Sequence, residues 1–347
     1  MRHINIPVFI PHMGCPNACV FCNQRRISGR TEFDIGAVEE ELERAVSTID
    51  YADSEVEIAF FGGSFTGIDR GDMLYLLGIA KKFVLAGKAQ SVRLSTRPDY
   101  IDGEILDILA EHCVTDIELG LQSMDDEVLM ASRRGHTAEC ARRACRMIKE
   151  RGFNLVGQMM IGLPTSTPEK EEATAREIVS RGCDAARIYP TVVFCETELC
   201  GMMERGEYIP LGEADAVKRS ARVLEVFVSA GIPVIRLGLC AADNLFEEGT
   251  MVGGAYHSAL GEMVYSELYY KRICESIEKN KQANGDILRI YVSPGEVSKA
   301  SGQKKYNKQR IAERYGTSDI RVTEDPSLAP YCVRTEFIGK GEKQQCI

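Results

Sequence analysis

Short apolar runs rich in β-branched residues alternate along the chain with longer stretches in which apolar residues recur every three or four positions. The first pattern predicts buried strands, and the second predicts amphipathic helices. The expected strands are Ile4 to Ile10, Glu55 to Phe61, Ser91 to Thr96, Asp116 to Leu121, Asn154 to Ile161 and Ala185 to Val193. The expected helices are Ile35 to Ile49, Met73 to Leu85, Ile101 to His112, Ala138 to Arg151 and Pro168 to Arg181.

Strands that alternate with helices indicate an α/β fold with a parallel sheet. Because the helices fall between successive strands, we expect the sheet to curl into a partial or complete (β/α) barrel, whose ligands bind at the carboxyl ends of its strands. Glycine and polar residues cluster at these ends, in Gly62-Gly63-Ser64, Ser95-Thr96-Arg97, Gly120-Leu121-Gln122 and Gly162-Leu163-Pro164. The sequence therefore predicts a ligand site at this edge of the sheet.

The alternation changes after Pro210. A helix (Gly212 to Ala230), a strand (Pro233 to Leu239) and a longer helix (Glu262 to Lys279) are expected first, and we place a domain boundary near residue 280. Residues 1–280 would then form the barrel domain with an extension, and residues 281–347 a small basic α/β module. In that module we expect strands at Asp286 to Val292 and Ile320 to Thr323, and short helices at Pro294 to Ser301 and Lys308 to Tyr315.

Charge divides the chain in the same way. The formal net charge is -9, which argues against a protein that coats nucleic acid over its whole surface. The segment from Lys279 to Arg321, however, holds ten Lys and Arg against four Asp and Glu, a local balance of +6 that leaves -15 for the remainder. A basic module attached to an acidic body is the simplest interpretation.

The N-terminal segment has only a short apolar run interrupted by prolines, too short for a signal peptide or a membrane span. We therefore expect a cytoplasmic protein with no membrane partner. In a large chain without a leader, thirteen cysteines indicate metal ligands and reduced buried thiols rather than a disulfide framework.

Cys15, Cys19 and Cys22 form a C-x3-C-x2-C group, a spacing that chance would produce about 0.02 times in a chain of this composition. A cubane iron–sulfur cluster normally takes four thiolates, so three leave one iron open for another ligand. A structural zinc site, or a chance grouping of buried cysteines, is the alternative, but no second cysteine pair or histidine stands at zinc-finger spacing to complete four ligands.

The stretch from Gly14 to Asn23 resembles the cluster loop of the radical S-adenosylmethionine (SAM) superfamily. The resemblance implies a 4Fe-4S cluster on the three cysteines, reductive cleavage of SAM to a 5'-deoxyadenosyl radical, and a low-potential electron donor such as ferredoxin or flavodoxin. It places Phe21 against the adenine of SAM. The run Phe60 to Thr66 is similar to the superfamily's glycine motif, which implies SAM contacts from Gly62, Gly63, Ser64 and Thr66.

Further runs resemble the radical SAM half of the Elongator catalytic subunit and, more distantly, oxygen-independent coproporphyrinogen oxidases. They are Leu94 to Asp99, Glu118 to Ser123, Arg133 to Thr137, Gly157 to Pro164 and Arg187 to Val193. By position in these motifs, Ser95, Arg97, Gln122 and Gln158 would contact SAM, and Arg134 would pair with its carboxylate, which a guanidinium can hold in bidentate fashion. A solvated charge at a helix end is the alternative for Arg134.

Two departures from the Elongator pattern matter. Elongator has a longer spacing between its first two cluster cysteines, and it carries an acetyltransferase domain that begins about where this chain stops. We therefore expect no acetyl-CoA chemistry here. The shared half implies SAM cleavage and a related RNA target, but not the same product.

The basic module contains Gly302 and, close after it, Lys304, Lys305 and Lys308, at an expected turn between two short helices. It resembles a small KH-type fold, whose glycine loop clamps a nucleotide backbone, although Lys305 replaces the second loop glycine. Lysines at this turn would neutralise phosphates of a folded RNA such as a tRNA. A solvated basic face on a small α/β cap is the alternative.

Three classes of function thus stay open: RNA modification, chemistry on a small metabolite or tetrapyrrole, and RNA binding without catalysis. The basic module favours the first, and the acidic barrel favours the second. The intact cluster and SAM motifs argue against the third. The sequence leaves open whether Cys195, Cys200, Cys332 or Cys346 has a redox role.

Overall fold

A seven-stranded parallel sheet forms the larger part of the molecule. The computed structural model describes residues 2–10, 14–15, 19–23, 33–239, 250–280, 287–317 and 319–338. The strand order is β1-β2-β3-β4-β5-β6-β8, and no described residues pair β1 with β8. The sheet is therefore an open half-barrel, which confirms the partial form of the expected barrel. The strands are β1 (Arg2–Ile10), β2 (Ser54–Gly62), β3 (Ser91–Thr96), β4 (Val114–Gln122), β5 (Asn154–Ile161), β6 (Ala185–Pro190) and β8 (Val234–Leu237).

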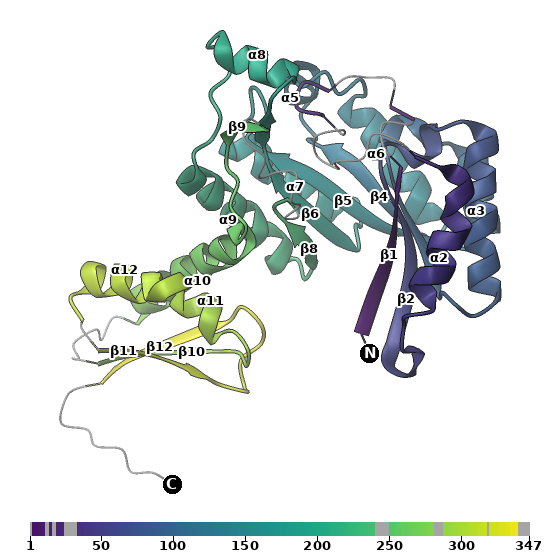
Figure 1. The fold of residues 1–347 in the computed structure, drawn as a ribbon. Coiled ribbons are helices and arrows are strands. Elements are labelled where there is room, and N and C mark those ends of the chain that lie inside the picture. Colours follow the sequence, from purple (N-terminus) through teal and green to yellow (C-terminus); the bar gives the residue numbers. More distant parts are fainter. Residues whose placement is uncertain are drawn as a thin grey trace.

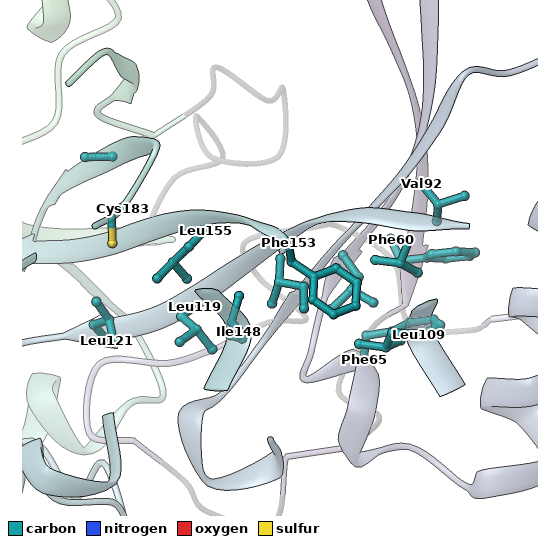
Figure 2. Packing of buried hydrophobic residues seen from close by; sticks show 14 of the residues in the cluster. Phe60, Phe65, Val92, Leu109, Leu119, Leu121, Ile148, Phe153, Leu155 and Cys183 are labelled. Atoms are coloured by element: carbon teal, nitrogen blue, oxygen red, sulfur yellow. The ribbon is translucent and has the colours of Figure 1, made fainter. Parts of the chain in front are cut away.

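Helices cover the convex face of this sheet (Figure 1). They are α2 (Val38–Val46), α3 (Arg70–Leu85), α4 (Gly103–Glu111), α6 (Ala138–Glu150), α7 (Pro168–Ser180) and α9 (Glu213–Ser229). Several begin at a polar residue whose side chain accepts a backbone N–H of the first turn, as Asp102 does for α4 and Thr137 for α6. Figure 2 shows Leu119 and Leu155 of the sheet in the apolar layer that Ile148 of α6 also enters.

The concave face of the sheet is polar and charged, since successive strand residues point to opposite faces. Arg93 of β3 pairs with Glu57 of β2 at 2.7 Å and with Glu118 of β4 at 3.3 Å. Glu118 also accepts from Arg187 of β6 at 2.7 Å, and the Arg187 guanidinium lies 5.5 Å from the centre of the Phe61 ring. Both carboxylates in these pairs are almost fully buried. The network links β2, β3 and β4, which are neighbours, and reaches across β5 to β6.

Small elements occur in the loops between strands and helices. They are the 3-10 helices η1 (Ile35–Ala37), η3 (Phe65–Gly67) and η4 (Pro98–Tyr100), the helices α5 (Asp126–Ala131) and α8 (Glu198–Glu204), and η2 (Tyr51–Asp53), which directly precedes β2. The expected strand over 185–193 is two strands, because the chain leaves the sheet after Pro190. Its continuation, β7 (Val192–Phe194), pairs in antiparallel fashion with β9 (Met251–Gly254).

A second, three-stranded sheet forms near the C-terminus, with the order β11-β10-β12. Its elements are β10 (Ile287–Val292), α11 (Val297–Ser301), η6 (Gln303–Lys305), α12 (Tyr306–Tyr315), β11 (Asp319–Glu324) and β12 (Val333–Ile338). Strand β10 runs parallel to β11 and antiparallel to β12, a strand that the sequence pattern did not predict. Figure 1 shows α10, α11 and α12 on one face of this sheet.

Helix α10 (Leu260–Lys279) belongs to both parts of the molecule. Its residues Leu260, Val264 and Leu268 lie in the main apolar core. Tyr269, Ile273 and Ile277 lie instead in the core of the small sheet. The boundary at residue 280 stays a prediction, but the small sheet takes part of its core from before it. Among the described residues, no helix has both the length and the apolar character needed to cross a lipid bilayer.

Candidate active site

The loop that carries the three cysteines is held at the carboxyl edge of the half-barrel. Gly14 has φ +76°, and a Cβ there would lie 2.1 Å from the carbonyl oxygen of Ser64, so the loop begins in direct contact with the turn after β2. Farther along, the Val20 N–H donates to the carbonyl of Ser132 at 3.2 Å. The Val20 carbonyl accepts the N–H of Leu199 at 2.8 Å. The loop is thus attached to the segments that follow β2 and α5 and to α8.

The three thiols differ in their surroundings. Cys19 is 6% exposed, whereas Cys15 and Cys22 are exposed. Residues 16–18, between the first two cysteines, lie outside the described residues. Within the described ranges, no three side chains of His, Cys, Asp or Glu stand close enough together to hold a metal ion. The assignment of Cys15, Cys19 and Cys22 as cluster ligands therefore stays a prediction, tested below by iron content.

Two buried arginines stand beside the Cys19 sulfur. Nη1 of Arg134 lies 3.4 Å from this Sγ atom, and Nη1 of Arg97 lies 3.9 Å from it. Iron binds cysteine as the thiolate, and the two guanidinium groups lie where they can compensate the negative charge of such a sulfur ligand. Three cysteines with this charged surrounding fit the donor chemistry of an iron–sulfur cluster.

Asp99 fixes the position of Arg97. Its two carboxylate oxygens accept from Nε and Nη2 of Arg97 at 2.9 and 2.8 Å, and Nη2 also donates to the carbonyl of Arg134 at 2.6 Å. Burial disfavours the charged guanidinium, but the hydrogen bonds and charge of Asp99 outweigh it and raise the pKa of Arg97. Burial likewise acts against the Asp99 carboxylate, and Arg97 nevertheless lowers its pKa. Both groups are therefore charged at neutral pH.

The turn after β2 is fixed by backbone geometry and by hydroxyl groups. Gly62 has φ +114°, and a Cβ there would lie 2.4 Å from the carbonyl oxygen of Ile10, so only glycine fits. The Gly63 N–H donates to this carbonyl at 2.9 Å. The Thr96 hydroxyl lies 2.8 Å from that of Ser64 and 2.6 Å from that of Thr66. Ser64 and Thr66 are thus buried supports of the turn; their contact with SAM, and that of Gly62 and Gly63, stays a prediction.

Gln122 and Arg134 are buried, and each has one polar side-chain atom with no hydrogen-bond partner among the described residues. Gln122 ends β4 with φ +66° and is 5% exposed, and its Oε1 has no hydrogen-bond partner among the described residues. Arg134 is 7% exposed; its Nη2 donates to the carbonyl of Gly120 at 2.6 Å, but its Nε has no described partner. Buried polar groups are normally paired, and a strained residue such as Gln122 is typical of a functional site. Both observations fit a bound ligand at this edge.

The remaining predicted SAM contacts lie at the same edge. The Ser95 hydroxyl donates to Glu118 at 3.3 Å, and Gln158 is partly exposed on β5. Phe21 packs beside Val20 against an apolar cluster that includes Leu199 and Tyr208, so its ring has neighbours within the chain. Contact of Ser95, Gln158 or Phe21 with SAM stays a prediction.

A cavity of about 440 Å³ adjoins the loop after β5, and Leu163, Tyr208 and Ile209 are among its lining residues. The Tyr208 hydroxyl donates to the carbonyl of Gly162 at 2.7 Å. Burial raises the pKa of Tyr208 to about 12, so this donor keeps its proton at neutral pH. Tyr208 therefore holds the loop at the end of β5 through this hydrogen bond.

His136 is a buried neutral group near the two arginines. It is 7% exposed, its Nδ1 lies 3.3 Å from the carbonyl of Thr137, and its Nε2 has no described partner. Burial, and then the positive charge of Arg134, lower its pKa to about 4. The imidazole is therefore uncharged at neutral pH.

Sequence reasoning missed three residues that organise this region: Asp99, Glu118 and Arg187. Asp99 follows Arg97 by two positions, which is a spacing that allows a local bidentate pair. The signal for Glu118 and Arg187 was the alternation of charged residues with apolar ones along strands that were predicted correctly. Such alternation indicates a polar inner face.

The other singled-out cysteines fall in different places. Cys195 lies near the cluster loop, since its carbonyl accepts from Nδ2 of Asn23 at 3.3 Å. Cys200 is buried, with Glu204 3.6 Å from its sulfur. Cys332 is exposed, and Cys346 lies outside the described residues. Nothing in these contacts assigns a redox role.

The three predicted RNA-binding lysines lie at the turn between α11 and α12. Lys304 and Lys305 are exposed and both have positive φ, 49° and 65°. Lys308 is partly buried, and its Nζ donates to the carbonyl of Ile320 at 3.2 Å. Lys304 and Lys305 are thus the lysines of the three that face solvent.

Comparison with known proteins agrees with the motifs and the fold. Residues 9–178 match the model of the radical SAM superfamily, and residues 183–270 match that of the radical SAM C-terminal domain. The tRNA uridine(34) acetyltransferase of Methanocaldococcus infernus is 30% identical over 181 residues, which are 51% of this chain and 33% of that protein. Human Elongator complex protein 3 is 30% identical over 141 residues, 40% of this chain and 26% of that protein.

A solved structure of archaeal Elp3 from M. infernus, with residues 1–46 deleted, superposes with a TM-score of 0.59 at 22% identity and covers 78% of this chain and 63% of that one. At this identity the likeness concerns the fold alone. The chain thus spans about a third of the curated acetyltransferase and under two thirds of the solved one. On the two matched models, the loop and the half-barrel, this chain belongs to the radical SAM superfamily and is an enzyme whose cofactors are a 4Fe-4S cluster and SAM.

Proposed function

We propose that this enzyme modifies a folded RNA, and specifically a tRNA, by radical chemistry. The cluster and SAM supply the 5'-deoxyadenosyl radical, so the protein's work is binding, orientation and exclusion of water. Support comes from the relatives, since proteins named for acetylation of tRNA uridine 34 align with half of this chain. It also comes from the lysine turn, described next.

The half-barrel would hold the reactants at its carboxyl edge. Cys15, Cys19 and Cys22 would bind the cluster. The unpartnered Nε of Arg134 can donate to a carboxylate, and the unpartnered Oε1 of Gln122 can accept from an amino or hydroxyl group. SAM carries groups of all three kinds. The polar inner face beneath them offers both donors and acceptors to a substrate.

The observation that carries the proposal is the conformation of the lysine turn. Two consecutive lysines in the left-handed region cost free energy, and such strain is typical of functional sites. Lys305 also precedes the ten-residue helix α12 and provides no side-chain cap. The Tyr306 N–H donates to the Gln303 carbonyl, but the N–H groups that follow it in the first turn can act with the lysines on the same anion. The neighbouring Tyr306 is 58% exposed and can stack on a base.

Other cations of the basic segment are neutralised by nearby acids. Lys299 pairs with Glu296 at 2.7 Å, Arg310 with Glu267 at 2.5 Å, and Arg314 with Glu278 at 2.8 Å. No described acid pairs with Lys304 or Lys305. The local charge of the module is therefore concentrated at the turn, where a phosphate backbone would gain most.

The test is tRNA binding by a Lys304→Glu, Lys305→Glu double variant. Each phosphate contact contributes roughly 0.7 to 0.9 to the slope of log affinity against log salt, so two lost contacts should flatten the slope by about 1.5. The matched control is Lys218→Glu with Lys271→Glu, which makes the same change in net charge at two exposed lysines elsewhere. Lys308→Met tests separately whether a lysine already bonded to the Ile320 carbonyl contributes.

We expect the double variant to lose tRNA affinity steeply and to keep SAM cleavage in the absence of RNA. The control pair should keep most of the affinity. Unchanged affinity and salt slope in the double variant would refute the RNA proposal and favour a small metabolite or tetrapyrrole as substrate. RNA binding without SAM turnover in the wild type would refute the catalytic part.

A further inference from the structure

Two arginines, Arg97 and Arg134, stand beside the Cys19 sulfur. We propose that Arg97 and Arg134 raise the reduction potential of the cluster by placing positive charge and N–H donors at the Cys19 sulfur. The proposal rests on the cluster as the cofactor of this superfamily and not on an RNA substrate.

The contacts single out one of the three cysteines. Nη1 of Arg134 is 3.4 Å and Nη1 of Arg97 is 3.9 Å from the Cys19 sulfur, within the range of N–H···S contacts. Cys19 is 6% exposed, Arg134 is 7% exposed and Arg97 is 2% exposed, so water screens these charges little. Cys15 and Cys22 are exposed. The described N–H···S contacts of the two arginines therefore go to Cys19.

Hydrogen bonds fix the Arg97 guanidinium in this position. Asp99 takes its Nε and Nη2 atoms at 2.9 and 2.8 Å, and the carbonyl of Arg134 accepts from Nη2 at 2.6 Å. These three bonds leave Nη1 as the end of the guanidinium that faces Cys19. The carboxylate of Asp99 would compensate for Arg97 at long range, but it lies on the far side of the guanidinium from the sulfur.

Reduction places one more negative charge on the cluster. In the assay this electron comes from dithionite, which is oxidised, and no bond in the protein forms or breaks. Nearby buried cations stabilise the added charge, and hydrogen bonds to sulfur act in the same direction. Loss of either arginine should therefore make the cluster harder to reduce.

The experiment is a spectroscopic redox titration of the fully loaded enzyme, without SAM and without RNA. We compare wild type with Arg97→Gln and Arg134→Gln, each checked for about four irons per chain. Both variants should titrate at a more negative potential, so that the ratio of reduced to oxidised cluster at a fixed potential falls by about tenfold or more. Arg97→Lys, which keeps the charge, should recover most of this ratio.

Arg93→Gln is the matched control for loss of a buried guanidinium. Arg93, on β3, is also held by carboxylates, those of Glu57 and Glu118, and has no described contact with Cys19. It stands four residues before Arg97, about 13 Å along the strand direction. The reduction potential of the cluster in Arg93→Gln should equal that of the wild type. If the Gln variants do not load, Asp99→Asn keeps both arginines and removes the carboxylate that partly compensates Arg97, so it should shift the potential in the opposite direction, to less negative values.

An unchanged potential in fully loaded Arg97→Gln and Arg134→Gln would overturn the proposal, as would an unchanged potential in Asp99→Asn where only that variant loads. An equal shift in Arg93→Gln would overturn it too, because the effect would then be a general one of lost buried charge. None of these results bears on RNA, so the proposal can fail while the proposed function stands.

Discussion

Acidification should destabilise this protein through one histidine, His136. Its pKa is about 4 in the folded chain, against an ordinary value of 6.5 in the unfolded one. Because the folded state disfavours the charged imidazole, the stability that the neutral ring allows is complete above pH 6.5. It is lost progressively as the pH falls from 6.5 to 4, since the unfolded chain binds the proton first.

The size of the effect follows from the gap between the two pKa values. At about 1.4 kcal/mol for each pH unit, the gap corresponds to about 3 kcal/mol lost by pH 4. The cause is structural: His136 is 7% exposed, its Nε2 has no described partner, and the charges of Arg134 and Arg97 oppose protonation. Asp99 acts in the opposite direction but does not compensate.

The assay is urea unfolding of wild type and His136→Gln at half-unit steps from pH 7.5 to pH 4.5, under anaerobic conditions. Carboxylates also contribute to acid unfolding, so the informative quantity is the difference between the two proteins at each pH. Below pH 6.5 the wild type should lose up to about 1.4 kcal/mol per unit more than the variant. A variant at the exposed His257, His257→Gln, should follow the wild type.

Parallel stability curves for wild type and His136→Gln would refute the reasoning. NMR of histidine-labelled protein gives an independent check, since only five histidines are present. A His136 signal that titrates near pH 6.5 in the folded chain would show that neither burial nor Arg134 controls it.

Three further predictions concern the site. Cys19→Ala should abolish binding of the four irons expected per chain, measured by iron and sulfide content; full loading of this variant would contradict the cluster assignment. Gly62→Ala should keep the iron but lose at least about tenfold in SAM affinity by calorimetry, because its Cβ would lie 2.4 Å from the Ile10 carbonyl oxygen and the turn must move; normal affinity would place SAM elsewhere. Tyr208→Phe should cost roughly 1–3 kcal/mol in unfolding free energy, because the Gly162 carbonyl loses its donor; an unchanged midpoint in urea would show that water replaces it.

The sheet could be predicted from sequence because each strand carries its own local signal. The expected strand Asn154 to Ile161 has the same limits as β5, and the expected Ser91 to Thr96 the same limits as β3. Strand β12 was missed because its buried position is Thr335, a polar residue whose hydroxyl lies 2.9 Å from that of Ser276. In a sequence pattern a buried threonine cannot be distinguished from a surface one, because its hydrogen-bond partner in α10 is known only from the structure.

The candidate site divides in a similar way. The motifs named Arg97 and Arg134, and their order along the chain placed both at one edge of the sheet. Neither motif could show that the two guanidinium groups turn toward Cys19, because this direction depends on Asp99, on the Arg134 carbonyl and on a loop that starts more than 70 residues earlier. Side-chain direction is a property of the packed edge and not of a spacing.

Helix α10 gives this protein an evolutionary constraint. Its 20 residues span about 30 Å, from the core of the barrel to the core of the small sheet. A descendant that lost the small sheet would expose Tyr269, Ile273 and Ile277 to water, so deletion must be accompanied by substitutions in a helix that the barrel still needs. The distance between the half-barrel and the lysine turn is therefore set by the length of α10 and should stay constant in related proteins that keep this helix. Any lineage that changes its partner must find one that matches this length, or must rebuild α10.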